Sequence, residues 1–319
     1  MTPREKQVTA CFAPRKMPGV VEWLSQNISL PRKMAPKASG RFTTSRRRYQ
    51  NTILECWHPE SGTNHVDVAG ATQGFKTTGC VLGICYRMKH KPWPVHIMGP
   101  AAKWSETEIG KLRMQPIIRE NRVLAELMPD DMDNFTNQLM DMKCGPIKIV
   151  GANSPTQIGG MSAGIVCIDE ATKIKKVMHE EAPDAHPIYN AWERSKDFRD
   201  VAYFHYMSSS PTSPNHPFWL SIEEGTQERF HCECPHCKEW FPFALPGYED
   251  MSSYFELIGK APPADYKSLI WDQSAKDVSG EWNQDKVRAS ARYVCPHNGC
   301  EINEQVRQGV VASAEITFP

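Results

Sequence analysis

The sequence lacks any run of about 18 apolar residues, the length that a membrane-spanning helix needs. Its first residues, Met1-Thr2-Pro3-Arg4-Glu5, lack the charged-then-apolar layout of a secretory signal. It also lacks an excess of charge of either sign, because 37 Lys and Arg balance 37 Asp and Glu. We therefore expect a cytosolic protein with no membrane partner, and bulk charge gives no argument for a nucleic-acid partner.

Internal repeats and low-complexity segments are also missing, which argues against a solenoid or a disordered chain. The 319 residues are 40% hydrophobic and 23% charged, values ordinary for a globular protein. This length accommodates one large α/β core and a smaller appended module.

Positive charge is unevenly distributed along the chain. Residues 1–50 carry eleven Lys or Arg against only Glu5 and Glu22. Such a segment either follows a phosphate backbone or forms a solvated, partly flexible arm. Five prolines within residues 1–36 limit regular structure to a short helix around residues 20–26. We predict a basic N-terminal arm over residues 1–42.

The chain then alternates between helical and strand patterns. The spacing of Tyr49, Ile53, Leu54 and Trp57 predicts an amphipathic helix over residues 44–57. The strands predicted after it cover residues 65–68, 95–98, 148–150, 164–168 and 201–207, with helices over 77–88, 106–119 and around 192–194. This order predicts an α/β fold whose mostly parallel central sheet is flanked by helices. The composition changes near residue 225, which predicts a core of residues 43–225 and a cysteine-rich module of residues 226–319. The second range also contains the end of the core region.

A glycine-containing loop follows the first strand and opens a helix. It reads Gly70-Ala71-Thr72-Gln73-Gly74-Phe75-Lys76-Thr77-Thr78. Binding a triphosphate needs inward backbone N–H groups, a helix N-terminus, a lysine for the β and γ phosphates and a hydroxyl for Mg²⁺. Phe75 stands where the phosphate-loop pattern has its second glycine, which predicts a wider turn. An ordinary strand-to-helix turn with a surface lysine is the alternative reading.

The apolar strand of residues 164–168 ends in two adjacent carboxylates, Asp169 and Glu170. In a phosphate-loop enzyme the neighbouring strand delivers an aspartate toward Mg²⁺, and the next glutamate polarises the attacking water. A buried strand followed by a solvated acidic turn would look the same. The order of loop, about ninety residues of βα structure and acidic strand favours nucleotide hydrolysis.

A third strand pattern ends in small hydroxyl residues and a proline. The segment is Ser209-Ser210-Pro211-Thr212, and its position beside the two loops suits a role in sensing the γ-phosphate. A plain turn after a strand would have the same composition.

Five of the eleven cysteines crowd into two clusters near the C-terminus. The spacing resembles a zinc ribbon with four thiolates, Cys234, Cys237, Cys295 and Cys300, and a closed four-ligand site is structural. The spare ligands Cys232, His231, His236 and His297 could replace any of the four, and unpaired surface thiols are the alternative.

These motifs together resemble the ATPase portion of the large terminase subunit of tailed bacteriophages, in the lambda GpA-like group. The resemblance runs from about Phe42 to Cys300 and also includes Arg48-Tyr49-Gln50 and Ile149-Val150-Gly151-Ala152-Asn153-Ser154. It implies that residues 70–78 are the Walker A loop and that Asp169 and Glu170 belong to Walker B. Lys76, Asp169 and Glu170 would be catalytic, with Asp169 and Thr77 at Mg²⁺ and Glu170 as the base. Tyr49 and Gln50 would contact adenine, and Ser209, Ser210, Pro211 and Thr212 would couple hydrolysis to movement.

The resemblance further implies an ATP-driven double-stranded DNA translocase of the host cytoplasm, not expected in the mature virion. Its partners would be a small terminase subunit, a portal and procapsid, and further copies of itself on assembly. An arginine finger would come from Arg194 or from a neighbouring subunit. A nuclease domain is not expected within this chain. The alternatives are a helicase-like ATPase, and a zinc-ribbon nucleic-acid-binding module whose phosphate loop is inactive.

Overall fold

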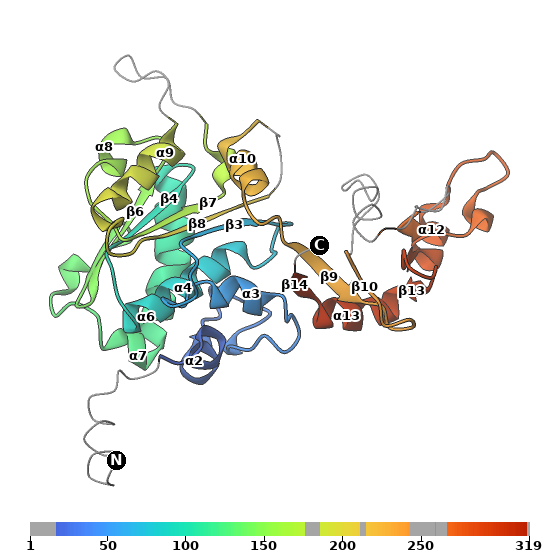
Figure 1. The fold of residues 1–319 in the computed structure, drawn as a ribbon, viewed down its shortest axis with the longest axis horizontal. Coiled ribbons are helices and arrows are strands. Elements are labelled where there is room, and N and C mark those ends of the chain that lie inside the picture. The colour runs from blue at the N-terminus through green and yellow to red at the C-terminus, as the bar shows by residue number, and fades with distance from the viewer. Residues whose placement is uncertain (1–16, 176–185, 211–214, 243–258, 260–266, 318–319) are drawn as a thin grey trace, which may run out of the picture.

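The computed structural model describes residues 17–175, 186–210, 215–242, 259 and 267–317. None of the helices in these ranges combines the length and the apolar character that crossing a membrane requires. The described chain forms an α/β core and a smaller C-terminal module, which lies on the right in Figure 1.

A six-stranded sheet forms the centre of the core. Its order is β3 (His65–Ala69), β8 (Phe204–Ser209), β7 (Ile165–Asp169), β4 (Val95–Gly99), β6 (Gly145–Gly151) and β5 (Leu139–Met142). Neighbouring strands from β3 to β6 pair in parallel, and β5 pairs antiparallel to β6 at the edge. The predicted α/β class with a mostly parallel sheet is confirmed, and β5 is an addition that the sequence patterns did not indicate.

Both faces of this sheet are buried. Along β7, Ile165 and Cys167 face one apolar cluster with α4 (Lys76–Lys89), whereas Val166 and Ile168 face a second cluster with α9 (Pro187–Trp192). Figure 1 shows helices on both sides of the strands. Two buried faces explain why the central strands read as continuous apolar runs.

Short helices complete the two layers. They are α3 (Gln50–Glu55), α5 (Ala102–Trp104), the π-helix η1 (Ser105–Met114), α6 (Gln115–Glu120), α7 (Arg122–Ala125), α8 (Pro155–Ile158) and α10 (Pro217–Glu224), with 3₁₀ turns η2 (Met132–Asn134), η3 (Ala171–Lys173) and η4 (Glu193–Phe198). The predicted helix over residues 44–57 is too long. Its first residues form turns, in which the amide of Arg47 bonds the carbonyl of Thr44, and α3 starts only at Gln50.

Part of the segment predicted as an arm packs on the core. Helix α2 (Val20–Asn27) buries Val20, Trp23 and Leu24, and a hairpin of β1 (Ser29–Leu30) and β2 (Gly40–Arg41) follows it. The Glu55 carboxylate accepts hydrogen bonds from the first two amides of α2, at 3.2 and 3.0 Å. A carboxylate on free helix N–H groups stabilises this start of the helix. Residues 20–42 are therefore not a free arm, although most side chains between Pro31 and Phe42 are exposed.

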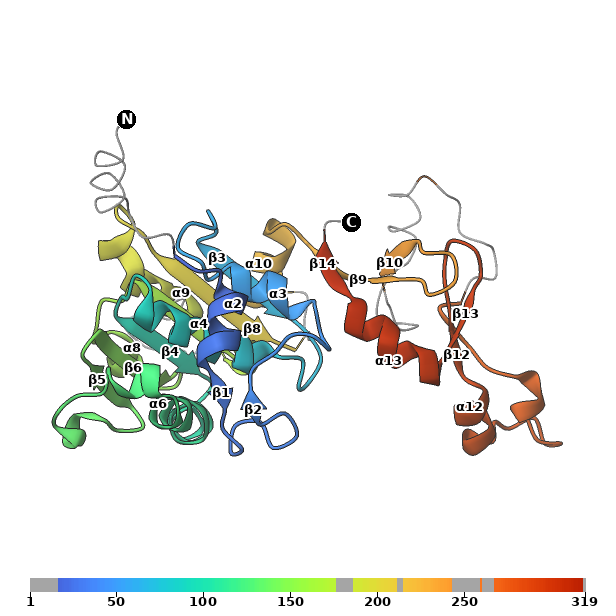
Figure 2. The same ribbon diagram turned by 90° about the horizontal axis from the view of Figure 1, so that it is seen from below.

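The C-terminal module has two small sheets. One has the order β10 (Trp240–Pro242), β9 (Arg229–Glu233), β14 (Glu315–Thr317), and the other β11 (Leu269–Ile270), β12 (Arg292–Val294), β13 (Glu301–Asn303). Helices α12 (Gln284–Ser290) and α13 (Glu304–Ser313) and the turn η5 (Gln273–Ala275) accompany them. The module contacts the core through the Phe230 ring, 5.2 Å from that of Tyr49, and through a 3.3 Å bond from the Arg48 amide to the Ala312 carbonyl. Figure 2 shows β14 and α13 on the side of the module that faces α3.

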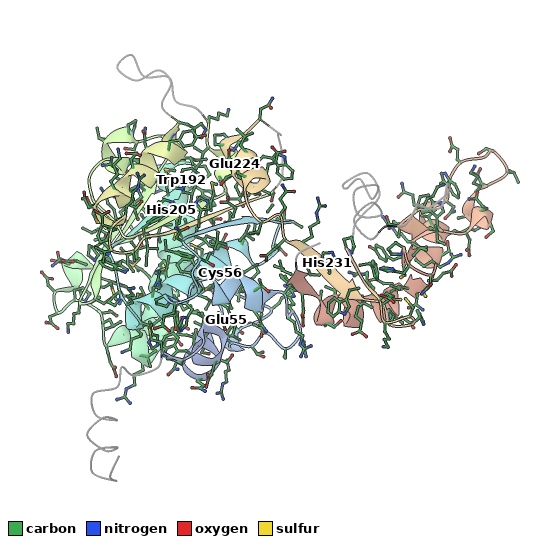
Figure 3. All side chains as sticks on the ribbon, in the orientation of Figure 1. Glu55, Cys56, Trp192, His205, Glu224 and His231 are labelled. Carbon is green, nitrogen blue, oxygen red and sulfur yellow. The ribbon has the colours of Figure 1, made fainter. Side chains whose placement is uncertain are left out.

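Four basic side chains and one valine lie in a row across five strands of the sheet, on the face covered by α9. The register places His65, His205, Val166, His96 and Lys148 side by side on five strands. The His205 ring stacks on the Trp192 indole at 5.8 Å and bonds the Ser195 hydroxyl at 2.8 Å, and Figure 3 shows Trp192 next to His205. His96 is fully buried, and among the described residues neither of its ring nitrogens has a hydrogen-bond partner. Burial lowers the pKa of His96 to about 4 and that of His205 to about 3, so both rings are neutral at pH 7.

Candidate functional site

The carboxyl ends of β3, β8 and β7 lie next to one another, because these strands are parallel neighbours. The segments that follow them carry the predicted loop, hydroxyls and carboxylates. The amide of Gly70 bonds the Ser209 carbonyl at 3.1 Å, which joins the loop after β3 to the end of β8. Three motifs that are far apart in the sequence therefore meet at one edge of the sheet, where ligands of open α/β sheets bind.

The loop is a tight turn that enters α4. The Gly74 amide bonds the Ala71 carbonyl at 3.1 Å, and a Cβ on Gly74 would lie 2.8 Å from that oxygen, so only glycine fits there. Phe75 caps α4 with φ 75°, the left-handed region that glycine adopts most easily. Phe75 is 8% exposed, and its ring stacks on that of Phe42, with centroids 6.5 Å apart. The expected wider turn is not observed, since burial of the phenyl ring offsets the backbone strain and the turn stays closed.

Lys76 lies inside this loop. Its ammonium donates to the carbonyls of Gly70 and Ala71 at 2.9 and 2.7 Å and to the Ser210 hydroxyl at 3.4 Å. Burial lowers the pKa of Lys76, while the carboxylates of Glu170 and Asp169 raise it. The Tyr206 hydroxyl fixes the start of the helix by donating to the Lys76 carbonyl at 2.8 Å. The ammonium is thus a donor held among oxygen atoms, the arrangement that suits phosphate oxygens.

Asp169 is 1% exposed and accepts three hydrogen bonds. The Thr77 hydroxyl donates to Oδ2 at 2.6 Å, and the Ser208 hydroxyl and Glu170 amide donate to Oδ1 at 2.7 and 3.0 Å. Burial raises the pKa of Asp169, and the bonds from Thr77 and Ser208 oppose that effect. The loop hydroxyl and the strand carboxylate therefore touch, and both are oxygen ligands of the kind that Mg²⁺ takes.

Glu170 turns away from the strand with φ 53°, and its carboxylate pairs with the Lys173 ammonium at 2.9 Å. Thr172 joins this turn to the hydroxyl segment. Its amide and hydroxyl contact the Ser209 hydroxyl at 3.0 and 2.6 Å, and its hydroxyl donates to the Ser210 carbonyl at 3.1 Å. The sequence patterns missed Thr172, although a hydroxyl two residues after the carboxylates was the available signal.

Other predicted residues lie elsewhere or outside the described chain. Pro211 and Thr212 lie outside the described residues. Tyr49 and Gln50 start α3, where the Tyr49 ring packs on Phe230 of the module. Arg194 donates to the carbonyls of Asn190 and Gly159, and its own carbonyl accepts from Ala163, just ahead of β7. Asp169 is the last residue of β7, whereas Arg194 lies near the first, so Arg194 is at the amino ends of the strands, away from the candidate site. Its expected role as an arginine finger within the same chain is therefore wrong.

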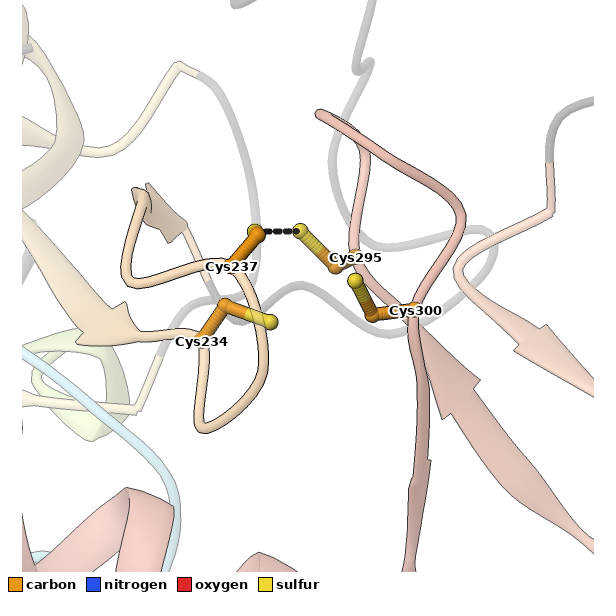
Figure 4. Close-up of side chains that lie close together, drawn as sticks. All are labelled: Cys234, Cys237, Cys295 and Cys300. Atoms are coloured by element: carbon orange, nitrogen blue, oxygen red, sulfur yellow. Dashed lines mark hydrogen bonds between the residues drawn. The ribbon is translucent and has the colours of Figure 1, made fainter.

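The four predicted cysteines of the module converge. The sulfur atoms of Cys234, Cys237, Cys295 and Cys300 all lie within 4.8 Å of one another. Figure 4 shows these four side chains grouped between the two halves of the module. Burial opposes ionisation of Cys237, yet the Glu239 amide and the neighbouring thiols lower the pKa of that thiol to about 7. Four sulfur donors in one compact group fit a tetrahedral zinc ion.

Each cysteine pair sits in a tight turn that also carries a histidine. The amide of Lys238 bonds the Cys234 carbonyl, and that of Gly299 bonds the Cys295 carbonyl, both at 3.0 Å. The His236 ring donates to the Glu301 carbonyl at 3.1 Å, and the His297 ring donates to the Trp240 carbonyl at 3.0 Å. Each histidine thus reaches across to the other half of the module.

The remaining spare ligands lie outside this group of sulfur atoms. Cys232 is buried on β9, and Nδ1 of His231 lies 3.0 Å from the Arg229 carbonyl. These geometries favour the four thiols over the spare ligands that the sequence left open.

The parallel sheet, with a glycine loop and an acidic strand end at one edge, defines an α/β fold of the P-loop NTPase class. The chain belongs to a phage terminase family, because the family model described as phage terminase large subunit gpA, ATPase domain, matches residues 37–315. The resemblance inferred from the motifs is thereby confirmed. The matched model describes the ATPase domain of a terminase large subunit.

Among solved structures, the chain is similar to three phage terminases. The large terminase of bacteriophage HK97 has 11% identity and a TM-score of 0.47 over 84% of this chain and 50% of that chain. A large terminase from a thermophilic bacteriophage has 14% identity and a TM-score of 0.40 over 56% of this chain and 43% of that chain. The ATPase domain of the Thermus phage P74-26 large terminase has 16% identity and a TM-score of 0.35 over 53% of this chain and 66% of that chain. The chain thus spans about half the length of the first of these relatives. No curated protein sequence matches it.

Proposed function

We propose that this chain is the ATP-hydrolysing motor of a viral packaging terminase, which translocates double-stranded DNA into a procapsid. The observation that carries the proposal is the 2.6 Å bond between the Thr77 hydroxyl and the Asp169 carboxylate, with Lys76 in the same loop. An inactive phosphate loop would not need a buried carboxylate joined to the loop hydroxyl.

In this proposal the residues divide the chemistry among them. Residues 70–78 wrap the phosphates with backbone N–H groups, and Lys76 supplies positive charge to the β and γ phosphates. Thr77 and Asp169 would hold Mg²⁺, which neutralises charge on the phosphates when bound. Glu170 orients the attacking water and takes its proton, for which it must separate from Lys173.

The hydroxyl segment is proposed to report hydrolysis to the rest of the motor. Ser210 bonds Lys76, and Thr172 ties Ser209 and Ser210 to the turn that carries Glu170. A change at the γ-phosphate would therefore reach Ser209 and Ser210 directly, and Pro211 and Thr212, which follow them in the sequence, are proposed to belong to the same coupling segment. Tyr49 and Gln50 stay candidates for the adenine contact.

The assembled machine is proposed to contain several copies of the chain, a small terminase subunit and the portal of the procapsid, acting in the host cytoplasm. Since the Arg194 guanidinium donates to the carbonyls of Asn190 and Gly159, away from the candidate site, the arginine finger would come from a neighbouring copy. The four-cysteine cluster is proposed to hold one structural Zn²⁺.

Three substitutions test the nucleotide chemistry. Lys76→Ala and Asp169→Asn should lower both nucleotide affinity and turnover, because they remove phosphate and Mg²⁺ contacts. Glu170→Gln should leave ATP affinity near that of the parent and lower turnover by on the order of 100-fold or more, the loss typical of a missing general base.

The measurements are steady-state ATP turnover and equilibrium binding of a fluorescent ATP analogue. Glu126→Gln is the matched control, since Glu126 is a surface residue paired with Arg122. Parental turnover in Glu170→Gln would contradict the assignment of the base, and parental turnover in Lys76→Ala would contradict the nucleotide site itself.

A further inference from the structure

A basic segment, residues 32–48, lies between α2 and α3. It contains seven cationic side chains and no Asp or Glu; these are Arg32, Lys33, Lys37, Arg41, Arg46, Arg47 and Arg48. All seven are exposed. Within the described part of the chain, Arg48 alone of the seven has a carboxylate within 4 Å, that of Glu315 at 3.9 Å. The overall charge of the protein is zero, so this concentration of one sign is local.

The fold holds this segment in place. Arg41 lies on β2, opposite Ser29 of β1, and its guanidinium donates to the Ser25 carbonyl at 2.7 Å. The loop between these strands carries Arg32, Lys33 and Lys37, while Arg46 lies in the turn ahead of α3. Between the two groups Phe42 is buried against the phosphate loop. The cations therefore project from an anchored hairpin and turn.

The composition of the exposed positions indicates the kind of partner. The exposed residues between the cations are small or polar, such as Ala38, Ser39, Thr43 and Ser45, and the only aromatic residue of the segment, Phe42, is 3% exposed. Single-stranded nucleic acids bind through stacking on exposed aromatic rings, and stable protein interfaces have an apolar centre. Neither feature is present here, whereas Lys and Arg on a polar surface suit a phosphodiester backbone.

We propose that the basic segment of residues 32–48 binds the backbone of duplex DNA without reading its sequence. The inference deepens the proposed function, on which it rests for the presence of DNA, by naming the surface that DNA meets. Six cations without a carboxylate partner could each contact one phosphate. Six contacts give a slope of log binding constant against log salt of about −5, or on the order of 10³-fold weaker binding between 50 and 200 mM salt.

The test replaces four of these cations together, Lys33→Ala, Lys37→Ala, Arg46→Ala and Arg47→Ala. Arg41 and Arg48 stay, because they bond the backbone and Glu315. The matched control removes four exposed cations elsewhere, with the same change of net charge. These are Arg122→Ala, Lys143→Ala, Lys196→Ala and Arg288→Ala.

Binding of a mixed-sequence 30-base-pair duplex is measured by fluorescence anisotropy between 50 and 200 mM salt. The four-site variant should lose only about 10-fold over this range, as expected for two remaining contacts, and the control variant should follow the parent. A variant whose salt dependence equals that of the control would overturn the proposal. Equal competition by polyglutamate at the same charge concentration would also overturn it, because the segment would then bind any polyanion.

ATP turnover without DNA keeps this test separate from the proposed function. Turnover should be the same in parent, four-site variant and control, since none of the changed residues contacts the phosphate loop. If turnover is intact and the DNA result is negative, the surface assignment fails while the ATPase proposal stands. If the parent itself has no turnover but the four-site variant loses DNA binding, the surface stands and the motor proposal fails.

Discussion

The buried histidine on β4 gives the sharpest stability prediction. Both ring nitrogens of His96 lack a hydrogen-bond partner in the part of the chain that the structure describes, and burial lowers the pKa of His96 to about 4 from an ordinary value of 6.5. In the unfolded chain the ring takes up a proton near pH 6.5, but in the folded chain it does so only near pH 4. The unfolded state therefore binds more protons between these values, so stability is complete above pH 6.5 and is lost as the pH falls.

Each unit by which the pKa of a group differs between the folded and the unfolded chain corresponds to 1.36 kcal/mol of unfolding free energy, which sets the size of the loss. From pH 7.5 to pH 5, His96 costs about 2 kcal/mol of unfolding free energy, and His205, with a pKa of about 3, costs about 2 kcal/mol more. In His96→Leu the fall over this range should be smaller by about 2 kcal/mol. At pH 7.5 the variant should be more stable by about 1 kcal/mol, because two unsatisfied polar atoms leave the core.

Urea unfolding followed by circular dichroism at pH 7.5, 6 and 5 measures this difference. Ile97→Val, a buried change on the same strand without a titrating group, is the control. It should lower stability by about 1 kcal/mol at every pH and keep the parent's pH dependence. If His96→Leu and the parent lose the same free energy between pH 7.5 and 5, the neutral buried histidine is not a source of acid sensitivity.

Three further outcomes are expected. Cys295→Ala should lower the zinc content, measured by elemental analysis, from about one ion per chain to near zero. Cys232→Ala changes a buried cysteine outside the cluster and should leave the zinc content unchanged. Zinc retained in Cys295→Ala would show that Cys295 is not a ligand. Phe42→Ala should weaken ATP binding and lower the unfolding free energy by about 3 kcal/mol, because the ring that covers Phe75 is lost. If ATP binding measured by calorimetry is unchanged, the stacking of Phe42 on Phe75 contributes to stability but not to ATP binding. Arg194→Ala should keep basal ATP turnover within about twofold, and a loss near the 10³-fold typical of an arginine finger would restore the role we reject.

The parallel strands were predictable because their chemistry is local. Each of β4, β7 and β8 is a short apolar run buried on both faces, and such runs stand out in a sequence. The edge strand β5 was missed because it alternates exposed and buried residues over only four positions. The helix expected over residues 44–57 has the right apolar spacing, but the contacts that decide where α3 starts come from turns and from the distant module.

The candidate site was predictable to the extent that motif residues sit at strand ends. Parallel strands bring their carboxyl ends together, so Lys76, Asp169 and Ser209 could be expected to meet. The contacts of Thr172 were not predictable, because they depend on how the turn after β7 folds over the end of β8. The tolerance of Phe75 in a glycine position was also hidden, since it depends on Phe42, which lies more than thirty residues earlier.

Two histidines of the module, one in each cysteine turn, bond the opposite half of the module. His236 and His297 each donate from Nε2 to a carbonyl of the opposite half, and neither bond involves a sulfur atom. The atoms that make these two bonds are therefore separate from the four thiols that would hold a metal ion. The two halves of the module are thus joined both by the cysteine cluster and by a pair of hydrogen bonds that does not use it, so a metal ion would not be the sole link between them.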